Sequence, residues 1–588
     1  MGKVHVTIDG IQVYVPDTYT VLEAAKEINI HIPTLCFLKD ISEIGCCRMC
    51  LVEIVGKKEW QAACVYPVSE GMNITIGSPK ATAARRTSVE LLLSNHNRNC
   101  QECEKNEYCE LLDVARRVGA RENQYEGEKT PTTLDNLSPT IVRDTSKCIL
   151  CGRCIARCAN AHGNGILGFE NRGFKTILAP AENRHFEDSP CIMCGQCVSV
   201  CPTGALMEKS EIDKVDEAMK AGKYVVVQTA PAVRAALGEE FGMKIGTPVT
   251  GQMVAALKRL GFKKVFDTNY AADLTIMEEA NELLDRIKNK GVLPMITSCS
   301  PGWINYCEYY YGDQVDHLSS CKSPHEMMGA ILKSYYASKI GVDPKDMFVV
   351  SIMPCTAKKF EEQRPQLANK DGIRDVDAVL TTRELGRLIK RSGIEFTKLP
   401  DEDFDTDFVH DTTGAAHIFG VTGGVMEAAL RTAYFVLEGK EYGEIEFHQV
   451  RGFEGIREAE FTLGGVNIKV AVASAMKNAK VLMDQIREGK SPYTFIEIMG
   501  CPGGCINGGG QPYVRSVFLP NEDLDIYETY QQKRANALYS EDERSVIRQS
   551  HNNVQVQELY KEFLEKPLSH KAHELLHTTY TKDRVRFD

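Results

Sequence analysis

The sequence of 588 residues is too long for one compact core, and its length suggests about four domains. Hydrophobic residues make up 43% and charged residues 25%, as in ordinary soluble proteins. The net charge of -11 argues against nucleic acid as a partner, because phosphate binding needs excess Lys and Arg. No apolar stretch approaches the roughly 18 residues of a membrane span, and the first residues do not form a signal peptide, so we expect a cytoplasmic protein.

Cysteine is the most informative residue, because the chain contains 22 of them. The cytosol keeps thiols reduced, so we do not expect disulfides. Nearly all of the cysteines fall into tightly spaced groups, which favours metal ligation. We interpret the groups before residue 210 as a relay for electrons and the later ones as the site where the relay ends.

Residues 1–79 predict a small β-grasp domain. Two alternating strand patterns lie on either side of Asp9 and Gly10, which together form a strong hairpin signal. Thr20 and Glu23 have the spacing of a capping box and predict a helix that begins at the next residue, Val21.

Four cysteines of this domain have the spacing of a plant-type 2Fe-2S ferredoxin, with three close together and one later. They are Cys36, Cys47, Cys50 and Cys64. Cys46 stands beside Cys47 and competes with it for the second position. We favour Cys47 because it gives the C-x2-C spacing with Cys50.

Residues 80–125 predict a second cluster domain, in which residues 80–99 are rich in Ala, Arg and Leu and form a helix. An H-x3-C-x2-C-x5-C group follows, and its members are His96, Cys100, Cys103 and Cys109. Zinc also accepts one imidazole and three thiolates. We favour a 4Fe-4S cluster over zinc because cluster motifs lie on both sides.

Residues 126–210 predict a domain with two 4Fe-4S clusters, after a polar stretch at 121–145 that we expect to be a surface linker. Two C-x2-C-x2-C-x3-C runs match the bacterial two-cluster ferredoxins, in which the fourth Cys of each run binds the other cluster. The first predicted ligand set is Cys148, Cys151, Cys154 and Cys201, and the second is Cys158, Cys191, Cys194 and Cys197. The second run has the usual trailing Pro, whereas the first has Ala159 in its place.

Residues 211–524 alternate between strand and helix patterns, which predicts a large α/β domain with a largely parallel sheet. The predicted strands include residues 224–228, 264–267, 293–298 and 348–353, and the predicted helices include 253–260 and 274–287. Ligands of such domains gather beyond the carboxyl ends of the strands. Cys299 and Cys355 stand at such ends, so we expect them to meet.

Three short stretches in this domain carry the cysteines of the predicted terminal site. They are residues 297–303 (TSCSPGW), 353–361 (MPCTAKKFE) and 499–512 (MGCPGGCINGGGQP). Cys501 and Cys505 stand among glycines, which let a backbone approach a bulky inorganic group. A flexible surface turn is the alternative, but the apolar pair Phe495 and Ile496 predicts a strand that delivers this loop.

With these motifs the chain resembles the FeFe-hydrogenases over essentially all of its length, and most of all the catalytic subunits of the NAD(P)-linked multisubunit type. Residues 525–588, which include the stretch Ser569–His577, then form a small-subunit-like segment that wraps the catalytic domain. The resemblance implies an H-cluster, in which a 4Fe-4S cubane shares a cysteine with a diiron subsite that carries CO, cyanide and an azadithiolate. It implies Cys355, Cys501 and Cys505 as cubane ligands, with Cys505 as the bridge.

The resemblance also implies roles for residues around the H-cluster. Protons would pass between solvent and the bridging amine along Glu282, Ser319, Glu279 and Cys299. Glu279 and Glu282 are three residues apart and so share one face of a predicted helix. Lys358 would hold a cyanide by a charge-assisted hydrogen bond. The other implied cofactor-binding residues are Ala230, Pro231, Ser323, Met353, Met499 and Phe419.

The chain departs from the family pattern at Ser300, where the second of two adjacent cysteines and fourth cubane ligand is usual. Three outcomes are open. Ser300 ligates iron through oxygen, Cys299 ligates in its place, or the cubane binds poorly. Adjacent residues at a strand end point in roughly opposite directions, so a simple exchange with Cys299 requires a backbone adjustment. The residues Ala232, Cys321 and His325 are further departures, since the family commonly has Ser, Ala and Gln there.

The leading hypothesis is an FeFe-hydrogenase subunit that interconverts H2 with protons and electrons. The alternative is a hydrogen-sensing or electron-transfer subunit whose H-cluster site is impaired by Ser300. The chain has no G-x-G-x-x-G after a strand and no P-loop, so nucleotide and flavin would belong to a partner. The expected partners are ferredoxin or a flavin-bearing NAD(P) diaphorase-type subunit, a small Fe-S subunit, and the proteins that mature the H-cluster.

Overall fold

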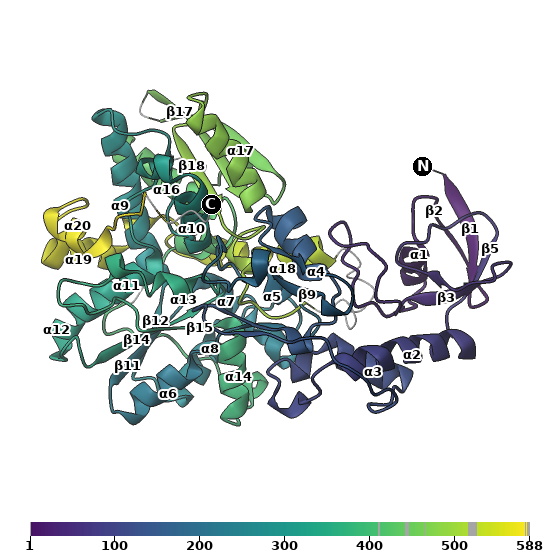
Figure 1. Ribbon diagram of the computed structural model, residues 1–588. Helices are drawn as coiled ribbons and strands as arrows, with labels where there is room; N and C mark the ends of the chain where they lie inside the picture. The colour runs from purple at the N-terminus through teal and green to yellow at the C-terminus, as the bar shows by residue number, and fades with distance from the viewer. Residues whose placement is uncertain are drawn as a thin grey trace.

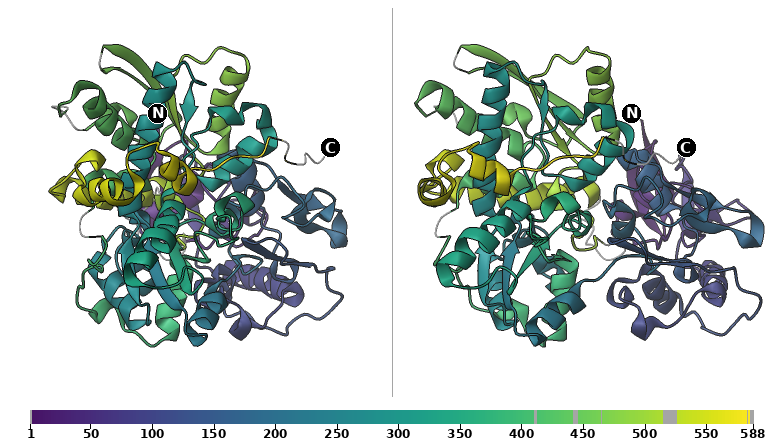
Figure 2. Two further views of the ribbon diagram at one scale, coloured as in Figure 1. Left: turned by 90° about the vertical axis from the view of Figure 1, so that its left-hand side faces the viewer. Right: turned by 60° about the vertical axis from the view of Figure 1, so that its left-hand side comes forward.

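The computed structural model describes residues 2–409, 412–441, 446–463, 465–514, 526–582 and 584. Figure 1 shows an extended molecule whose N-terminal strands lie at one end and whose last helices, α19 (Val554–Leu559) and α20 (His570–Leu576), lie at the other. In Figure 2 the purple N-terminal part lies behind the large body in the left view and to the right of it in the right view.

The N-terminal domain is a five-stranded sheet in the order β2-β1-β5-β3-β4, packed with helix α1 (Val21–Glu27). Its strands are β1 (Lys3–Ile8), β2 (Ile11–Pro16), β3 (Leu51–Ile54), β4 (Gln61–Ala62) and β5 (Met72–Thr75). The predicted hairpin joins β1 and β2. The predicted capping box is also confirmed, because Thr20 Oγ1 accepts the Glu23 N–H at 3.3 Å and the Glu23 carboxylate accepts the Thr20 N–H at 2.8 Å.

The next segment begins with the predicted helix, α2 (Pro79–Asn95), which packs on α3 (Glu110–Val118). A three-stranded antiparallel sheet follows, made of β6 (Leu134–Asp135), β7 (Ile141–Asp144) and β10 (Leu206–Glu208).

The prediction of a surface linker at 121–145 is wrong for the second half of that stretch. Strands β6 and β7 lie in this half, and Asp135, Ser138 and Thr140 are fully buried. Asp135 faces the buried guanidinium of Arg143 at 3.7 Å and accepts the backbone N–H of Phe186 at 2.9 Å. The composition of the stretch is polar, but its polar groups are buried because they have hydrogen-bond and ion-pair partners inside the fold.

The large domain contains two sheets. The first has the order β12-β11-β14-β15 and is fully parallel, and the second has the order β13-β18-β17-β16 with only β16 antiparallel to its neighbour. The strands of the first are β11 (Tyr224–Thr229), β12 (Lys264–Asp267), β14 (Met347–Met353) and β15 (Ala378–Thr381). Those of the second are β13 (Met295–Ile296), β16 (Ile456–Leu463), β17 (Val466–Ser474) and β18 (Phe495–Met499).

The predicted α/β domain with a largely parallel sheet is therefore confirmed, although it is divided between two sheets. Figure 1 shows β17 and β18 at the top of the molecule and β11, β14 and β15 below. The strand predicted over 293–298 is only two residues long, and its continuation is the irregular segment that carries Cys299. The predicted helices are present as α8 (Thr250–Arg259) and α9 (Asn269–Lys288).

The carboxyl ends of strands from both sheets point into the space between the sheets. Cys355 follows β14 of the first sheet, whereas Cys299 and Cys501 follow β13 and β18 of the second. The cysteines therefore converge because the two sheets face one another with their carboxyl ends together, the usual position of ligand sites in such folds.

The C-terminal segment wraps the large domain. Helix α18 (Ile526–Arg544) is tied to the cysteine loop through Tyr530, whose hydroxyl donates to Asn507 at 2.6 Å. Farther on, the Leu576 carbonyl accepts the Lys322 N–H at 2.8 Å. The predicted boundary at 524 lies outside the described residues. Among the helices that the structure describes, none combines the length and apolar character needed to cross a membrane.

The two-cluster domain docks on the large domain through its second cysteine loop. Thr356 Oγ1 donates to the Met193 carbonyl at 2.8 Å, and Gln196 Nε2 donates to the Asn507 carbonyl at 2.7 Å. Gly195 and Gly509 meet here, and a Cβ on Gly195 would lie 3.2 Å from the Gly509 Cα. The two backbones approach so closely because neither residue has a side chain.

The substitution Gly509→Ala tests this docking, because the added methyl group would collide with the carbonyl oxygen of Cys194. We expect a loss of about 1–3 kcal/mol, the usual effect of overpacking, visible as a lower midpoint of thermal unfolding. Gly168→Ala is the matched control, since a Cβ there meets no atom within 4 Å. Equal midpoints for the two variants would contradict the close contact.

Candidate active site

A cavity with about 740 Å³ of empty volume lies where the strand ends converge. Most of the residues that the sequence predicted for the terminal site line it. These are Ala230, Pro231, Cys299, Ser300, Met353, Cys355, Lys358, Phe419, Met499, Cys501 and Cys505. Residues missed by the sequence analysis also line the wall, among them Thr268 and Pro354.

Three thiols and one hydroxyl form a cluster in this wall. Cys355, Cys501 and Cys505 line the same cavity, and burial with the neighbouring thiols of Cys355 and Cys505 raises the pKa of Cys501. The hydroxyl of Ser300 is fixed at the same wall, because its Oγ accepts the backbone N–H of Gly500 at 2.9 Å.

The side chains of Cys299 and Ser300 have different neighbours. Burial and the nearby carboxylate of Glu279 raise the pKa of the Cys299 thiol well above its ordinary value. Ser300 instead contacts the loop of Cys501 through Gly500, and it immediately precedes helix α10 (Pro301–Tyr310). The structure therefore turns Cys299 toward the predicted proton route and Ser300 toward the cysteine loop.

Glu279 is a buried carboxyl group with only 1% of its surface exposed. Within the described part of the chain, neither carboxylate oxygen accepts a hydrogen bond. Burial and then the nearby Glu282 raise the pKa of Glu279 to about 8. Glu279 thus keeps a proton at neutral pH and stands next to Cys299.

A run of polar groups leads from Glu279 toward the surface. Ser319 Oγ donates to Glu282 Oε2 at 2.9 Å, and Glu282 Oε1 is ion-paired with Arg286 at 2.6 Å. The Arg286 side chain keeps 15% of its surface exposed. The structure therefore brings Cys299, Glu279, Ser319 and Glu282 near one another, and their order in a proton route stays a prediction.

Glu361 is the centre of a second polar network beside the cavity, which the sequence analysis did not identify. Its Oε2 accepts from Lys358 at 2.6 Å, from His325 at 2.7 Å and from Ser323 at 3.1 Å. Burial opposes its ionisation, but Lys358 and His325 outweigh burial and lower the pKa of Glu361 to about 2. The spacing of three residues between Lys358 and Glu361 was the available signal.

The sequence implied that Ser323 binds the cofactor and gave His325 no role at the site, and the structure places both residues differently. Ser323 does not line the cavity and contacts Glu361 instead. His325 does line it, and burial followed by the nearby Lys358 lowers the pKa of its imidazole to about 4. His325 is therefore neutral at pH 7 and fixes the Glu361 carboxylate that orients Lys358.

The first predicted ligand set of the two-cluster domain is gathered in one place. Cys148, Cys151, Cys154 and Cys201 line one common pocket. In the other group, burial and the thiol of Cys158 raise the pKa of Cys191. Burial and then the thiol of Cys501 raise the pKa of Cys194, so this group lies directly beside the cavity.

The N-terminal cysteine group is compact and buried. The Sγ atoms of Cys50 and Cys64 are 3.3 Å apart, and a hydrogen bond with Cys36 raises the pKa of Cys47. Cys46 is exposed, and its Sγ lies 3.9 Å from the carbonyl oxygen of Cys151 in the two-cluster domain. Cys46 and Cys47 both form a hydrogen bond with Cys36, so the choice of Cys47 stays a prediction from its spacing to Cys50.

His96, Cys100 and Cys109 line one hollow of the next domain. The buried Nδ1 of His96 has no hydrogen-bond partner among the described residues, as expected of a nitrogen that is free to bind a metal. Cys103 lies outside this lining, with its Sγ only 2.6 Å from where a Cβ on Gly204 would stand.

The raised pKa of Glu279 has a measurable consequence. An ordinary Glu loses its proton near pH 4.5, whereas Glu279 keeps its proton to about pH 8, so its contribution to stability weakens as pH rises between these values. We expect a carboxylic-acid band in the infrared spectrum at pH 6.5 that disappears as pH rises through about 8.

The variant Glu279→Gln should lack this titrating band. Glu326 is also fully buried and has a raised pKa, so the variant Glu326→Gln serves as the control and should keep the pH-dependent change. A band that titrates with the same pH dependence in Glu279→Gln would contradict the assignment.

Models of iron-sulfur families match successive parts of the chain. Residues 2–79 match a 2Fe-2S iron-sulfur cluster binding domain, 85–124 the NADH-ubiquinone oxidoreductase-G iron-sulfur binding region, and 140–202 a 4Fe-4S dicluster domain. Residues 223–509 match the C-terminal domain of the iron-only hydrogenase large subunit, and 528–583 the iron hydrogenase small subunit. The match at 85–124 favours iron-sulfur over zinc there.

Similar proteins cover the whole chain. A protein named NADP-reducing hydrogenase subunit HndD from Solidesulfovibrio fructosivorans is 46% identical over 99% of both chains. Iron hydrogenase 1 from Clostridium pasteurianum is 43% identical over 98% of this chain and 100% of its own. A solved structure of a variant of the [FeFe]-hydrogenase HydA1 from Chlamydomonas reinhardtii matches with a TM-score of 0.57 and 40% identity, covering 64% of this chain and 100% of that one.

These findings decide between the two functional hypotheses. The relatives that cover nearly the full chain are named hydrogenases, which does not favour an impaired sensing subunit. The iron-sulfur domains precede the hydrogenase domain in the order that the sequence motifs predict. The chain therefore belongs to the FeFe-hydrogenase family and is an oxidoreductase that acts on H2.

Proposed function

We propose that this chain interconverts H2 with protons and electrons at an H-cluster held in the cavity between the two sheets. One observation carries the proposal. Ser300, Cys355, Cys501 and Cys505 line a single cavity. The cysteine loop of Cys194 packs against this cavity on one side, and the run from Cys299 to Arg286 leads away from it toward solvent.

The residues present fit such a group. Thiolates are the usual ligands of iron-sulfur clusters, and three thiols face the cavity together. Gly504 lines the cavity with them, and its loop packs tightly on the neighbouring backbone, since a Cβ there would lie 2.7 Å from the Thr422 nitrogen. Once bound, the H-cluster supplies the iron centre at which the H–H bond is made or broken.

Lys358 is suited to hold an anionic ligand of the group. Burial opposes its charge, but Glu361 outweighs burial and raises the pKa of Lys358, so it stays a cation inside the cavity wall. Its Nζ also donates to the Cys299 carbonyl at 3.1 Å, which ties it to the same loop. A fixed ammonium group of this kind favours a cyanide through a charge-assisted hydrogen bond.

Cys299, Glu279, Ser319 and Glu282 are proposed to move the protons. Glu279 holds a proton at neutral pH beside the Cys299 thiol, and Ser319 donates to Glu282. Glu282 is ion-paired with Arg286 at 2.6 Å and keeps 8% of its surface exposed, so we propose that it exchanges the proton with solvent. Glu279 is buried, so bulk water does not reach its carboxyl group directly.

We propose Ser300 as the fourth ligand of the cubane. Its hydroxyl lines the cavity with the three thiols, and the Gly500 N–H that it accepts would stabilise an alkoxide. Cys299 is engaged with Glu279 instead, so ligation by Cys299 would remove it from the proton route.

The accessory clusters are proposed to form a relay. Cys36, Cys47, Cys50 and Cys64 would hold the 2Fe-2S cluster, and His96, Cys100, Cys103 and Cys109 a 4Fe-4S cluster. The two remaining 4Fe-4S clusters would take the ligand sets that the ferredoxin pattern gives. We propose domain limits at 79, 125, 210 and 524, which the spans of the family models support.

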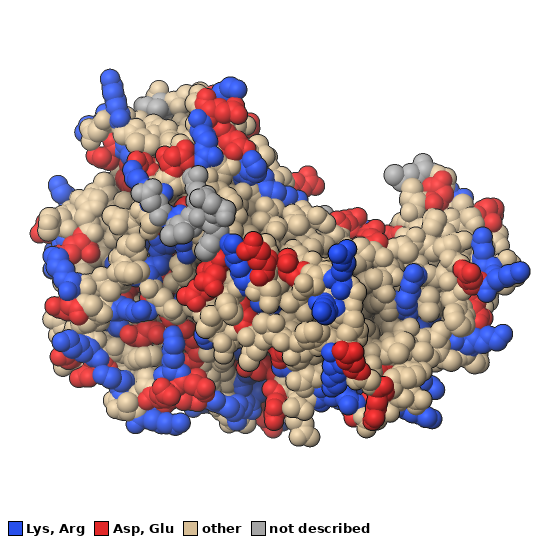
Figure 3. Space-filling model, viewed as in Figure 1, with Lys and Arg blue, Asp and Glu red and all other residues tan. Residues whose placement is uncertain are grey.

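The electron partners are proposed from the relatives. The name NADP-reducing hydrogenase subunit supports a flavin-bearing NAD(P) partner subunit and a small Fe-S subunit, with ferredoxin as a further donor or acceptor. Maturation proteins would build the H-cluster, and we propose a cytoplasmic location. On the face shown in Figure 3, acidic and basic side chains are interspersed, so one broad charged surface does not define the docking site.

Hydrogen evolution by the matured protein with a reduced dye tests the proposed activity. We expect Cys299→Ala and Glu279→Gln to lower the rate by at least about 100-fold, the effect of removing a proton-transfer group, with iron content unchanged. Cys307→Ala is the control, because Cys307 is fully buried but does not line the cavity. Fully loaded protein that evolves no H2 would contradict the proposed activity.

Two substitutions at Ser300 test the fourth ligand. We expect Ser300→Ala to lose much of the iron of the cubane, because its side chain offers no donor atom. Ser300→Cys should bind the cubane at least as well as the parent chain and shift its electron paramagnetic resonance signal, since a thiolate replaces oxygen. If Ser300→Ala keeps full iron and an unchanged signal, Ser300 is not a ligand.

A further inference from the structure

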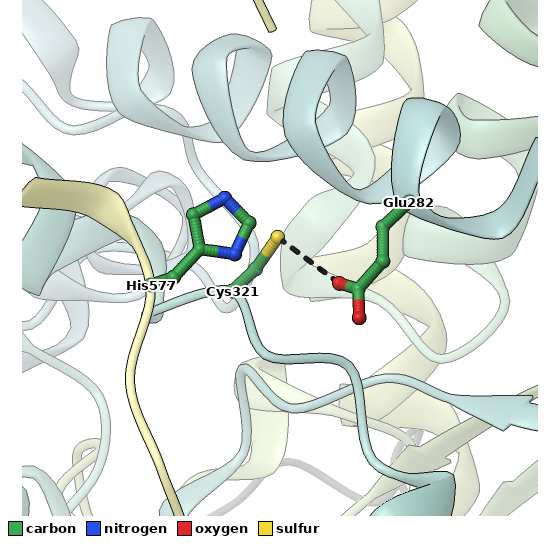
Figure 4. A group of neighbouring side chains, drawn as sticks. All are labelled: Glu282, Cys321 and His577. Atoms are coloured by element: carbon green, nitrogen blue, oxygen red, sulfur yellow. Dashed lines mark hydrogen bonds between the residues drawn. The ribbon is translucent and has the colours of Figure 1, made fainter. Parts of the chain in front are cut away.

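A second group of potential metal ligands lies outside the cavity, on the outer side of Glu282. Glu282, Cys321 and His577 come from helix α9, from the segment before helix α11 (Pro324–Ile331) and from the C-terminal segment. Their ligand atoms lie within 4.8 Å of one another, and all three residues are buried. We call this group the outer triad (Figure 4).

The three side chains point toward a common centre. Cys321 Sγ lies 3.7 Å from Glu282 Oε2, and the backbones of Cys321 and His577 are paired. In Figure 4 the ring nitrogen of His577 nearest its backbone, Nδ1, faces the sulfur atom. Glu282 and His577 each keep 8% of their surface exposed, whereas Cys321 keeps 1%.

The outer triad has the supporting contacts of a metal site. His577 Nε2 lies 3.1 Å from Glu278 Oε2, and Glu278 in turn accepts the Tyr560 hydroxyl at 2.5 Å and the Leu568 N–H at 3.0 Å. A carboxylate that accepts the far N–H of an imidazole fixes the ring and its tautomer, as it commonly does for metal-binding histidines. Nδ1 of His577 then carries the lone pair that could bind an ion. At present this nitrogen accepts a hydrogen bond from the hydroxyl of Ser320 at 2.8 Å, which a bound ion would replace.

The charges around the outer triad also match a divalent cation. Glu278, Glu282 and the thiolate form of Cys321 carry three negative charges, and Arg286 supplies one positive charge at 2.6 Å from Glu282. A divalent cation would neutralise the two negative charges that are left, and a buried site requires such compensation. Without a metal, burial and the carboxylates of Glu282, Glu279 and Glu278 raise the pKa of Cys321, so its thiol keeps its proton.

We propose that the outer triad binds a divalent cation of the zinc class and that the bound cation blocks proton transfer through Glu282. One thiolate, one imidazole and one carboxylate suit zinc, with water in the fourth position. Binding replaces the thiol proton of Cys321, which leaves to solvent, and no electron changes hands. The inhibition rests on the proposed role of Glu282 in the proton route, whereas the binding itself does not.

The test adds Zn²⁺ to the matured, chelator-treated protein and measures binding and turnover separately. Zinc-edge X-ray absorption should show one sulfur at about 2.3 Å and nitrogen or oxygen at about 2.0–2.2 Å, and Zn²⁺ should inhibit hydrogen evolution. Cys321→Ala and His577→Gln should lose the sulfur or imidazole contribution and resist inhibition relative to their own metal-free rates. Glu278→Gln should weaken Zn²⁺ binding by about 10–100-fold.

The matched control is His573→Gln, because His573 packs on His577 with ring centroids 4.2 Å apart but does not belong to the triad. This variant should bind zinc and be inhibited like the parent protein.

Equal zinc sensitivity in all variants, or an absorption spectrum without the sulfur contribution, would overturn the site. Zinc bound at the triad without inhibition would overturn the block at Glu282. If the protein evolves no hydrogen before zinc is added, the proposed activity is contradicted. The X-ray absorption data would still test whether zinc binds at the outer triad.

Discussion

The close contact between the second cysteine loop of the two-cluster domain and the cavity loops is the constraint on which the rest of the structure depends. Gly195 and Gly509 meet without side chains, and Thr356 and Gln196 fix the contact by hydrogen bonds to backbone carbonyls. This places the thiol of Cys194 beside that of Cys501. The relay and the catalytic site are thereby one continuous assembly, although their cysteines are some 300 residues apart in sequence.

The cavity also depends on how buried charge is arranged around it. Glu279 and Glu361 are both buried carboxyl groups, but Glu279 lacks a cation and keeps its proton, whereas Glu361 contacts Lys358 and stays ionised. The first environment suits proton transfer, and the second holds a cation at the cavity wall. This difference supports the proposal that one side of the cavity moves protons and the other orients an anionic ligand.

The cysteine spacings predicted the iron-sulfur domains, because the ligands of such clusters commonly stand at short, repeated intervals in sequence. The strand and helix patterns also predicted the α/β domain. The division into two sheets was not predictable, since Cys299 and Cys355 follow strand patterns that look alike but belong to different sheets. Polar residues such as Asp135 read as a linker because their buried partners are distant in sequence.

The contacts of single side chains were the least predictable part. Glu361 gathers Lys358, His325 and Ser323, and only its spacing from Lys358 was visible. His577 reaches the outer triad from the C-terminal segment, which no local pattern indicates. At Ser300 the sequence left three outcomes open, and the hydrogen bond from Gly500 supports the one in which oxygen is the ligand.

An infrared spectrum of the matured protein tests the central claim most directly, because iron-bound CO and cyanide absorb where the protein itself does not. We expect sharp bands from both ligands, with the cyanide bands shifted in Lys358→Met because the charged donor at the cavity wall is lost. A spectrum without such bands, in protein whose accessory clusters are fully loaded, would contradict an H-cluster in this cavity.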